Sequence, residues 1–123
     1  MFYTLRRKNY LKGEIEKIDK MIWKAEIKEQ AAREVIGRTD KAMKEKQEKF
    51  DDLGECLENE KKKEKLDRKK IEKIIGERVK LEKEIKEMED KKGKYVIELQ
   101  RLENEQEGAR QYQEIIRKVI ERG

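Results

Sequence analysis

The side chains that could do chemistry in this sequence are carboxylates, amines and a single thiol. The chain has 29 Asp and Glu, 34 Lys and Arg, one cysteine (Cys56) and no histidine. The commonest acid–base catalyst is therefore absent, and one cysteine cannot supply the several ligands of a zinc site. Neither GxxxxGK[ST] nor GxGxxG occurs, so no phosphate-binding loop is indicated. We predict a protein that is not an enzyme, with no catalytic residue, metal, cofactor or small-molecule substrate.

The elements that carry these side chains are predicted to be long helices. Charged residues make up 51% of the sequence and hydrophobic residues 34%, and there is no proline. That share of apolar residues is too small for an ordinary globular core, so a disordered chain and a long-helix protein remain. The polar residues are mainly Glu, Lys, Arg and Gln, which favour helix, whereas disordered chains are enriched in Pro, Ser and Gly. We therefore predict an all-α, coiled-coil fold.

A heptad repeat indicates which residues pack together. With Ile15 at position a and Ile18 at position d, one register runs unbroken from about residue 11 to residue 120. Sustained apolar a and d positions with charged flanks are typical of a coiled coil. The predicted seam consists of Leu11, Ile15, Ile18, Ile22, Ile36, Met43, Phe50, Leu53, Leu57, Ile71, Ile74, Leu81, Ile85, Met88, Leu99, Leu102, Ile116 and Ile120.

The segment ENEKKKEKLDRKK, residues 58–70, determines whether this repeat forms one long helix or two helices packed on each other. It has no Gly, Pro or Ser, and the register passes through it without a slip, which favours one long continuous helix. Against this, Glu60, Glu64 and Asp67 occupy successive seam positions and would face their own copies in a parallel dimer. The alternative is a two-helix antiparallel hairpin that bends near 58–70. A three-helix bundle with a further turn at residues 90–94 is the third option.

These alternatives share one division of the chain. In the hairpin, Leu11 would meet Ile120 and Ile15 would meet Ile116, so that the two halves pack on each other. In the long helix, the same residues would pack on a second chain. The division gives a basic aromatic N-terminal segment (1–12), a first coiled-coil segment (13–57), a charged seam break or bend (58–70) and a second coiled-coil segment (71–123).

Two basic segments are candidates for contact with an anionic partner. Residues 1–12 contain Arg6, Arg7, Lys8 and Lys12 and no acid, and residues 58–70 contain seven bases and four acids. Segments of this kind contact nucleic acid or an anionic membrane. An Arg-rich, acid-poor N-terminus also fits a mitochondrial targeting segment or a frayed helix start whose aromatic residues cap the coiled coil. A solvated helix face is the alternative for the second segment.

Two residues outside the seam are candidates for docking a protein partner. Trp23 and Ile27 fall at positions b and f, which face away from the seam, and tryptophan is frequent in binding hot spots. In a bundle the same pair would be a second core contact. Within the seam, Gln106 and Gln113 are expected to set the register, since two amides can pair across a seam.

The sequence also predicts where the protein works. A single cysteine and the lack of a signal peptide favour a reducing, intracellular setting, which we take as cytoplasmic. No apolar run approaches the ~20 residues that cross a membrane. Mitochondrial import remains the alternative location.

These observations predict a non-enzymatic coiled-coil scaffold that acts through protein partners, as a homodimer or a larger helical assembly. The first alternative is a helical-hairpin adaptor or stalk subunit within a larger machine, such as a secretion ATPase complex, by analogy of architecture alone. The second is an accessory protein that binds nucleic acid or an anionic membrane through its basic segments.

Overall fold

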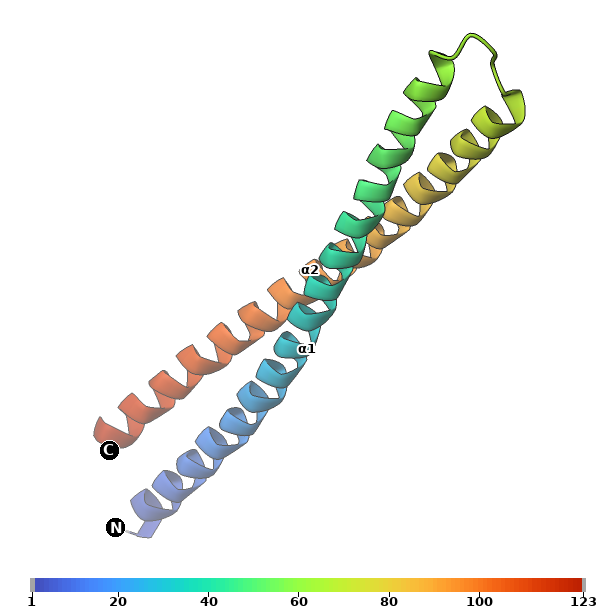
Figure 1. Cartoon of the computed structure of the whole chain (residues 1–123). Helices are drawn as coiled ribbons and strands as arrows, with labels where there is room; N and C mark the ends of the chain where they lie inside the picture. The colour runs from blue at the N-terminus through green and yellow to red at the C-terminus, as the bar shows by residue number, and fades with distance from the viewer. Residues whose placement is uncertain (1, 123) are drawn as a thin grey trace. The chain divides into compact units, whose positions relative to one another are not determined.

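Two long α-helices make up the fold. The computed structural model describes residues 2–122, with side chains from Leu5 to Arg122. Helix α1 spans Phe2–Lys61 and helix α2 spans Arg68–Arg122 (Figure 1). No strand occurs among the described residues. The all-α prediction is therefore confirmed, as expected for a chain whose polar residues are nearly all good helix formers.

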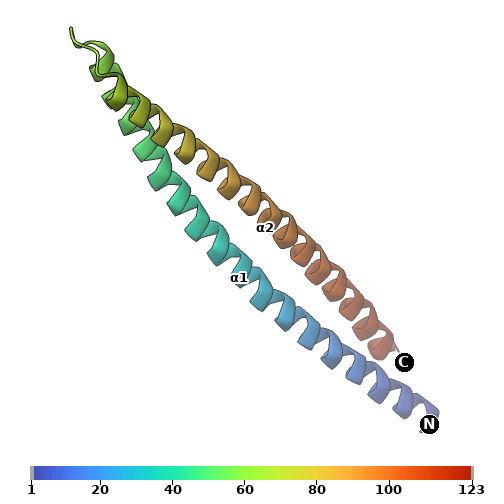
Figure 2. The same cartoon turned by 90° about the vertical axis from the view of Figure 1, so that its right-hand side faces the viewer.

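The helices are joined by a turn at residues 62–67, so the hairpin alternative is the fold that the structure has. A single continuous helix, our first interpretation, is not confirmed. At the end of α1, the Lys63 amide donates to the Glu60 carbonyl at 3.4 Å, a three-residue step that tightens the last turn. Figures 1 and 2 show the loop between α1 and α2.

Asp67 starts the second helix. Its carboxylate oxygen Oδ1 accepts a hydrogen bond from the Lys70 backbone amide at 3.2 Å, and its carbonyl accepts one from the Ile71 amide at 3.0 Å. This is the geometry of an N-cap, in which a short acidic side chain satisfies a free amide of the first turn. The prediction of a continuous helix rested on the lack of Gly, Pro and Ser in residues 58–70, with Asn59 as the one strong turn former, and left Asp67 out of account.

The third option, a bundle with a further turn at 90–94, is not observed. Helix α2 continues through these residues, Gly93 included. A glycine costs a helix only about 1 kcal/mol relative to alanine, which the surrounding lysines and glutamates offset. The same holds for Gly54, which lies within α1 without a break.

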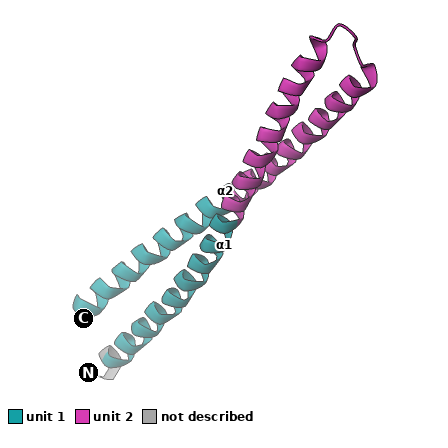
Figure 3. Cartoon of the chain, viewed as in Figure 1, with its two compact units in different colours: residues 1–34, 96–123 teal, residues 35–95 magenta. Residues whose placement is uncertain are grey.

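The chain forms two compact units, each an antiparallel pair of helix segments (Figure 3). Unit 1 combines the residues up to Glu34 with those from Val96 onward. Its core is a cluster of Ile18, Ile22 and Ile116, against which the half-buried Leu11, Ile15, Ala109 and Ile120 pack. The predicted pairs Leu11–Ile120 and Ile15–Ile116 thus lie in one cluster.

Unit 2 covers Val35–Tyr95 and contains the turn. Its most buried apolar residues, Leu57 and Ile74, lie close to that turn. Among the described side chains, three ion pairs join its helix segments: Lys46 with Glu84, Lys92 with Asp40 at 2.6 Å, and Lys70 with Glu60 at 3.0 Å. The α1 residue number rises from pair to pair as the α2 residue number falls, as antiparallel packing requires.

Candidate interaction surfaces

The heptad seam lies within the chain. All eighteen predicted seam residues are buried or half-buried. Leu102 is the most enclosed of them, with 2% of its surface exposed, and no other large side chain among those described is buried as fully. Each helix therefore uses its apolar stripe on the other, and the core is one side chain deep.

The two seam glutamines are held by α1. Gln106 and Gln113 are each 4% exposed. The Gln106 amide donates to Glu29 Oε2 at 2.6 Å, and the Gln113 amide donates to the Ile15 carbonyl at 3.2 Å and to the Asp19 carboxylate. A buried amide that finds its partner at one level of the opposite helix favours that alignment over a slipped one. We expected pairing between amides, and the partners are instead acids and a carbonyl.

Hydrogen bonds to Glu29 also set its ionisation. The Arg33 guanidinium, at 2.8 Å from Glu29 Oε1, is the main cause, and the Gln106 amide the second, of a lowered pKa for this carboxyl. A seam glutamate therefore stays charged because donors surround it.

Glu60 is a seam acid that the hairpin provides with partners. It is 6% exposed and lies 2.8 Å from Lys63 Nζ and 3.0 Å from Lys70 Nζ. The hydrogen bond from Lys63, followed by that from Lys70, lowers the pKa of the Glu60 carboxyl. In a parallel dimer this residue would face its own copy, whereas here two ammonium groups compensate its burial.

Arg78 is a cation of the seam that packs against the Phe50 ring and Gly54. Its guanidinium carbon lies 4.1 Å from the centre of the Phe50 ring, within cation–π range. Its Nε atom is buried and has no hydrogen-bond partner. A Cβ atom on Gly54 would come within 3.0 Å of Arg78 Nη2, so the glycine makes room for the guanidinium.

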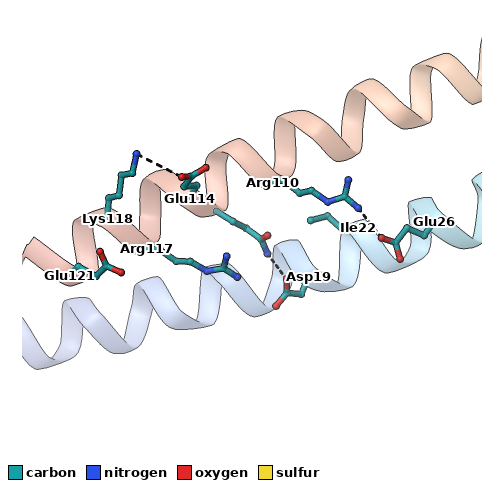
Figure 4. A pocket seen from close by; sticks show the side chains of 9 residues that line it. Asp19, Ile22, Glu26, Arg110, Glu114, Arg117, Lys118 and Glu121 are labelled. Atoms are coloured by element: carbon teal, nitrogen blue, oxygen red, sulfur yellow. Dashed lines mark hydrogen bonds and ion pairs between the residues drawn. The ribbon is translucent and has the colours of Figure 1, made fainter.

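One edge of unit 1, where the e positions of the two helices meet, carries matched charges. We call it the charged edge. Arg110 reaches Glu26 at 3.0 Å, and Arg33 reaches Glu103 at 2.8 Å (Figure 4 shows the first pair). An open groove of about 630 Å³ runs beside it. The groove is lined mainly by charged side chains from both helices: Asp19, Ile22, Glu26, Arg110, Gln113, Glu114, Arg117, Lys118 and Glu121. Because these charges largely neutralise one another, the groove offers no concentrated charge to a ligand.

The predicted docking pair is exposed. Trp23 and Ile27 leave 62% and 49% of their surfaces in solvent, and the structure brings no second core against them. They belong to a larger set, because unit 1 contains ten of the thirteen exposed large hydrophobic residues. These ten are Leu5, Tyr10, Met21, Trp23, Ile27, Val96, Ile97, Tyr112, Ile115 and Val119.

The predicted basic contacts lie in two places. Near the N-terminus, Arg6, Arg7 and Lys12 are exposed and Lys8 is half-buried. At the turn, every residue from 61 to 70 is exposed. The hairpin brings the bases at the end of α1 and those at the start of α2 to the two sides of one loop, an arrangement that the linear sequence does not show.

Among residues 2–122 no group of three or more His, Cys, Asp or Glu side chains is placed to hold a metal ion. In the same residues, neither helix contains a stretch long and apolar enough to cross a membrane. Comparison with protein-family models, curated proteins and solved structures finds no match for this chain. Its function therefore has to be argued from its own surfaces.

Proposed function

We propose that this chain is a non-enzymatic helical-hairpin protein that binds protein partners through the flanks of unit 1. The observation that carries the proposal is the distribution of apolar residues. One narrow seam buries a single layer of them, and ten further large apolar side chains remain exposed in unit 1. Clustered exposed apolar residues of this kind mark interaction surfaces.

The hairpin favours an adaptor over a scaffold that assembles through its heptad seam. A continuous helix would offer its seam to another chain, whereas here each helix fills the seam of the other. The surfaces left for a partner are the flanks and the outer faces. An adaptor or stalk subunit in a larger assembly has this requirement, and an intracellular setting remains part of the proposal.

Site-specific photo-cross-linking in cells that make the protein tests this proposal. A photoreactive amino acid replaces Ile115, Trp23 or, as the matched control, the exposed Lys83 of unit 2. We expect discrete cross-linked products, either with another protein or with a second copy, from Ile115 or Trp23 and none from Lys83. If no position of unit 1 gives a product with any protein, the proposal is wrong.

A second candidate function is favoured by the turn. Seven lysines and arginines lie between Lys61 and Lys70, and among the described residues only Lys61, Lys63 and Lys70 of these form ion pairs. The others are free to meet phosphate groups. Binding to a polyanion such as heparin should then weaken steeply as salt rises. Replacing Lys62, Lys65, Arg68 and Lys69 by glutamine should abolish it, and unchanged retention on heparin would exclude the idea.

A further inference from the structure

We propose that unit 1 pairs with a second copy of this chain through one apolar edge, forming a four-helix bundle. The edge consists of Tyr10, Met21, Tyr112, Ile115 and Val119, which we call the tyrosine edge. This inference rests on the proposed protein-binding function and names the surface, the partner and the arrangement.

The heptad positions place these five residues on one side of unit 1. Met21, Tyr112 and Val119 are at position g, and Tyr10 and Ile115 are at position c, which adjoins g on a helix. In an antiparallel pair, e positions meet on one edge and g positions on the other. The ion pairs Glu26–Arg110 and Arg33–Glu103 all join e positions and so fix the charged edge. Met21 correspondingly lies in a small depression with Glu105, another g residue.

The two edges of unit 1 therefore differ in chemistry. The charged edge is closed by interhelical ion pairs, and among the described side chains no ion pair joins the helices along the other edge. The exposed fractions there are 68% for Tyr10, 53% for Met21, 54% for Tyr112, 58% for Ile115 and 39% for Val119. Tyr112, Ile115 and Val119 have the i, i+3, i+7 spacing by which a helix presents an apolar stripe to another helix.

The exposed area indicates how much surface a partner has to cover. The chain exposes 10256 Å². Folded monomers of its mass, 14.9 kDa, expose about 7,000 Å². Obligate homodimers bury roughly 2,000–5,000 Å² in total, or about 1,000–2,500 Å² per chain. The excess of about 3,000 Å² is larger than the area that one such interface buries per chain, so the chain has enough exposed surface for a partner of this size.

The charges along the tyrosine edge favour a second copy as the occupant. On the α1 side, c and g positions between residues 14 and 28 carry three lysines (Lys17, Lys24, Lys28) and Glu14, a net charge of +2. On the α2 side, the c and g positions at the same levels, between residues 105 and 119, carry one charge, the acid Glu105. A two-fold axis along the helices lays α1 of one copy over α2 of the other, so that the basic α1 side meets an apolar stripe whose one charge is acidic.

The levels of the residues on this edge, that is, their positions along the helix axes, also agree with this arrangement. The Gln106–Glu29 hydrogen bond puts Lys28 and Glu105 within about 3 Å of one level, and the Gln113–Asp19 bond puts Met21 near the level of Tyr112. Across the two-fold axis, Lys28 would then face Glu105 of the other copy, and Met21 would face its Tyr112. The alternative axis, perpendicular to the helices, would place lysines against lysines.

The first experiment is the mass of the full chain by light scattering over a micromolar-to-millimolar concentration series. We expect the mass to approach twice 14.9 kDa. The double variant Tyr112→Lys, Ile115→Lys should stay at monomer mass with unchanged helicity, because both side chains are more than half exposed. The matched control Trp23→Lys, which replaces an exposed residue outside the edge, should pair as the unaltered chain does. A monomeric unaltered chain, or a dimer that survives the double variant, overturns the proposal.

Mixing two charge variants tests the arrangement itself. Lys28→Glu alone and Glu105→Lys alone should each weaken pairing, because each sets like charges against each other twice per dimer. An equimolar mixture should pair again, since both contacts are then of opposite charge. A role inside one chain cannot be rescued by mixing, so failure of the mixture to pair refutes the arrangement. Cross-links from Ile115 to other proteins, with a chain that stays monomeric, would end this inference and leave the proposed function intact.

Discussion

Replacing Gly54 by alanine should fail to stabilise the protein, although the same change at other helical glycines should succeed. An interior glycine costs a helix about 0.8–1.0 kcal/mol relative to alanine. At Gly37 and Gly76, both in unit 2, an added Cβ would have nothing within 4 Å. Gly37→Ala and Gly76→Ala should therefore each stabilise the fold by about 1 kcal/mol.

The contacts of Gly54 remove this gain. Its Cβ would lie 3.0 Å from Arg78 Nη2 and 3.3 Å from the guanidinium carbon, where ordinary contact needs about 3.5–4.0 Å. The guanidinium has to move by roughly half an ångström, which disturbs its position over the Phe50 ring, now at 4.1 Å. A disturbed cation–π contact costs about 0.5–1 kcal/mol. The two effects nearly cancel, so Gly54→Ala should change stability by about 0 kcal/mol.

Urea unfolding followed by far-UV circular dichroism measures these differences, at one protein concentration because pairing would add to stability. In thermal unfolding, a difference of 1 kcal/mol in the free energy of unfolding would correspond to about 4 °C in Tm for a chain of this size. In an Arg78→Leu background, Gly54→Ala should regain its full benefit, which gives a coupling of about 1 kcal/mol. If Gly54→Ala stabilises the unaltered chain as much as Gly37→Ala does, the packing of Arg78 against Gly54 is wrong.

Three further changes test the core, the turn and the seam acids. Leu102→Ala should lower the free energy of unfolding in urea by about 2–4 kcal/mol, because its side chain is the most enclosed of those described. The control Ile97→Ala, at a residue that is 72% exposed, should lower it by under about 0.5 kcal/mol. Equal costs would place the core elsewhere. Asp67→Ala should cost about 1 kcal/mol by removing the cap of α2, with the exposed Glu64→Ala as control, and equal effects of the two would deny the cap. The lowered pKa of Glu60 means that the folded state binds fewer protons than the unfolded state. The contribution of Glu60 to stability is therefore complete above the ordinary glutamate pKa of about 4.3 and is lost as pH falls through the folded pKa. Glu60→Gln should therefore flatten the acid limb of a stability–pH profile measured by thermal unfolding, and an unchanged limb would show that Lys63 and Lys70 do not stabilise the carboxylate.

The heptad repeat was sufficient to predict which faces of the helices are buried. Every a and d residue from Leu11 to Glu60 and from Ile71 to Ile120 is buried or half-buried. The pattern works because burial on a helix follows spacing alone, whatever lies opposite. For the same reason it could not reveal what lies opposite. A seam that packs on the same chain and one that packs on another chain have the same a and d positions.

The turn was harder to predict because its signal is small. An unbroken register favoured a continuous helix, yet two helices can share one phase on either side of a loop. The decisive residue is Asp67, whose side chain caps α2 at the Lys70 amide. A single aspartate among lysines and glutamates is an ambiguous signal in sequence, since it could equally lie on a solvated helix face. Of the tyrosine edge, the heptad register identifies Tyr112, Ile115 and Val119 as apolar residues outside the a and d positions, but it does not show that Tyr10 and Met21 lie beside them.

The polar seam residues have different neighbours in the hairpin and in a parallel dimer. In a parallel dimer, Glu60, Arg78 and Gln106 would each face an identical residue, and Glu60 would be destabilising. In the hairpin, Glu60 meets two lysines, Gln106 meets Glu29, and Arg78 covers Phe50. Lys70, Glu29 and Phe50 each lie at one level of the opposite helix, so a slipped alignment would bury the polar group without its partner, at a cost of about 1–3 kcal/mol each. The residues that interrupt the apolar stripe therefore fix the alignment of the helices within each unit. In unit 1, the Gln106–Glu29 and Gln113–Asp19 bonds set the levels at which Met21 and Tyr112, and Lys28 and Glu105, are presented along the tyrosine edge.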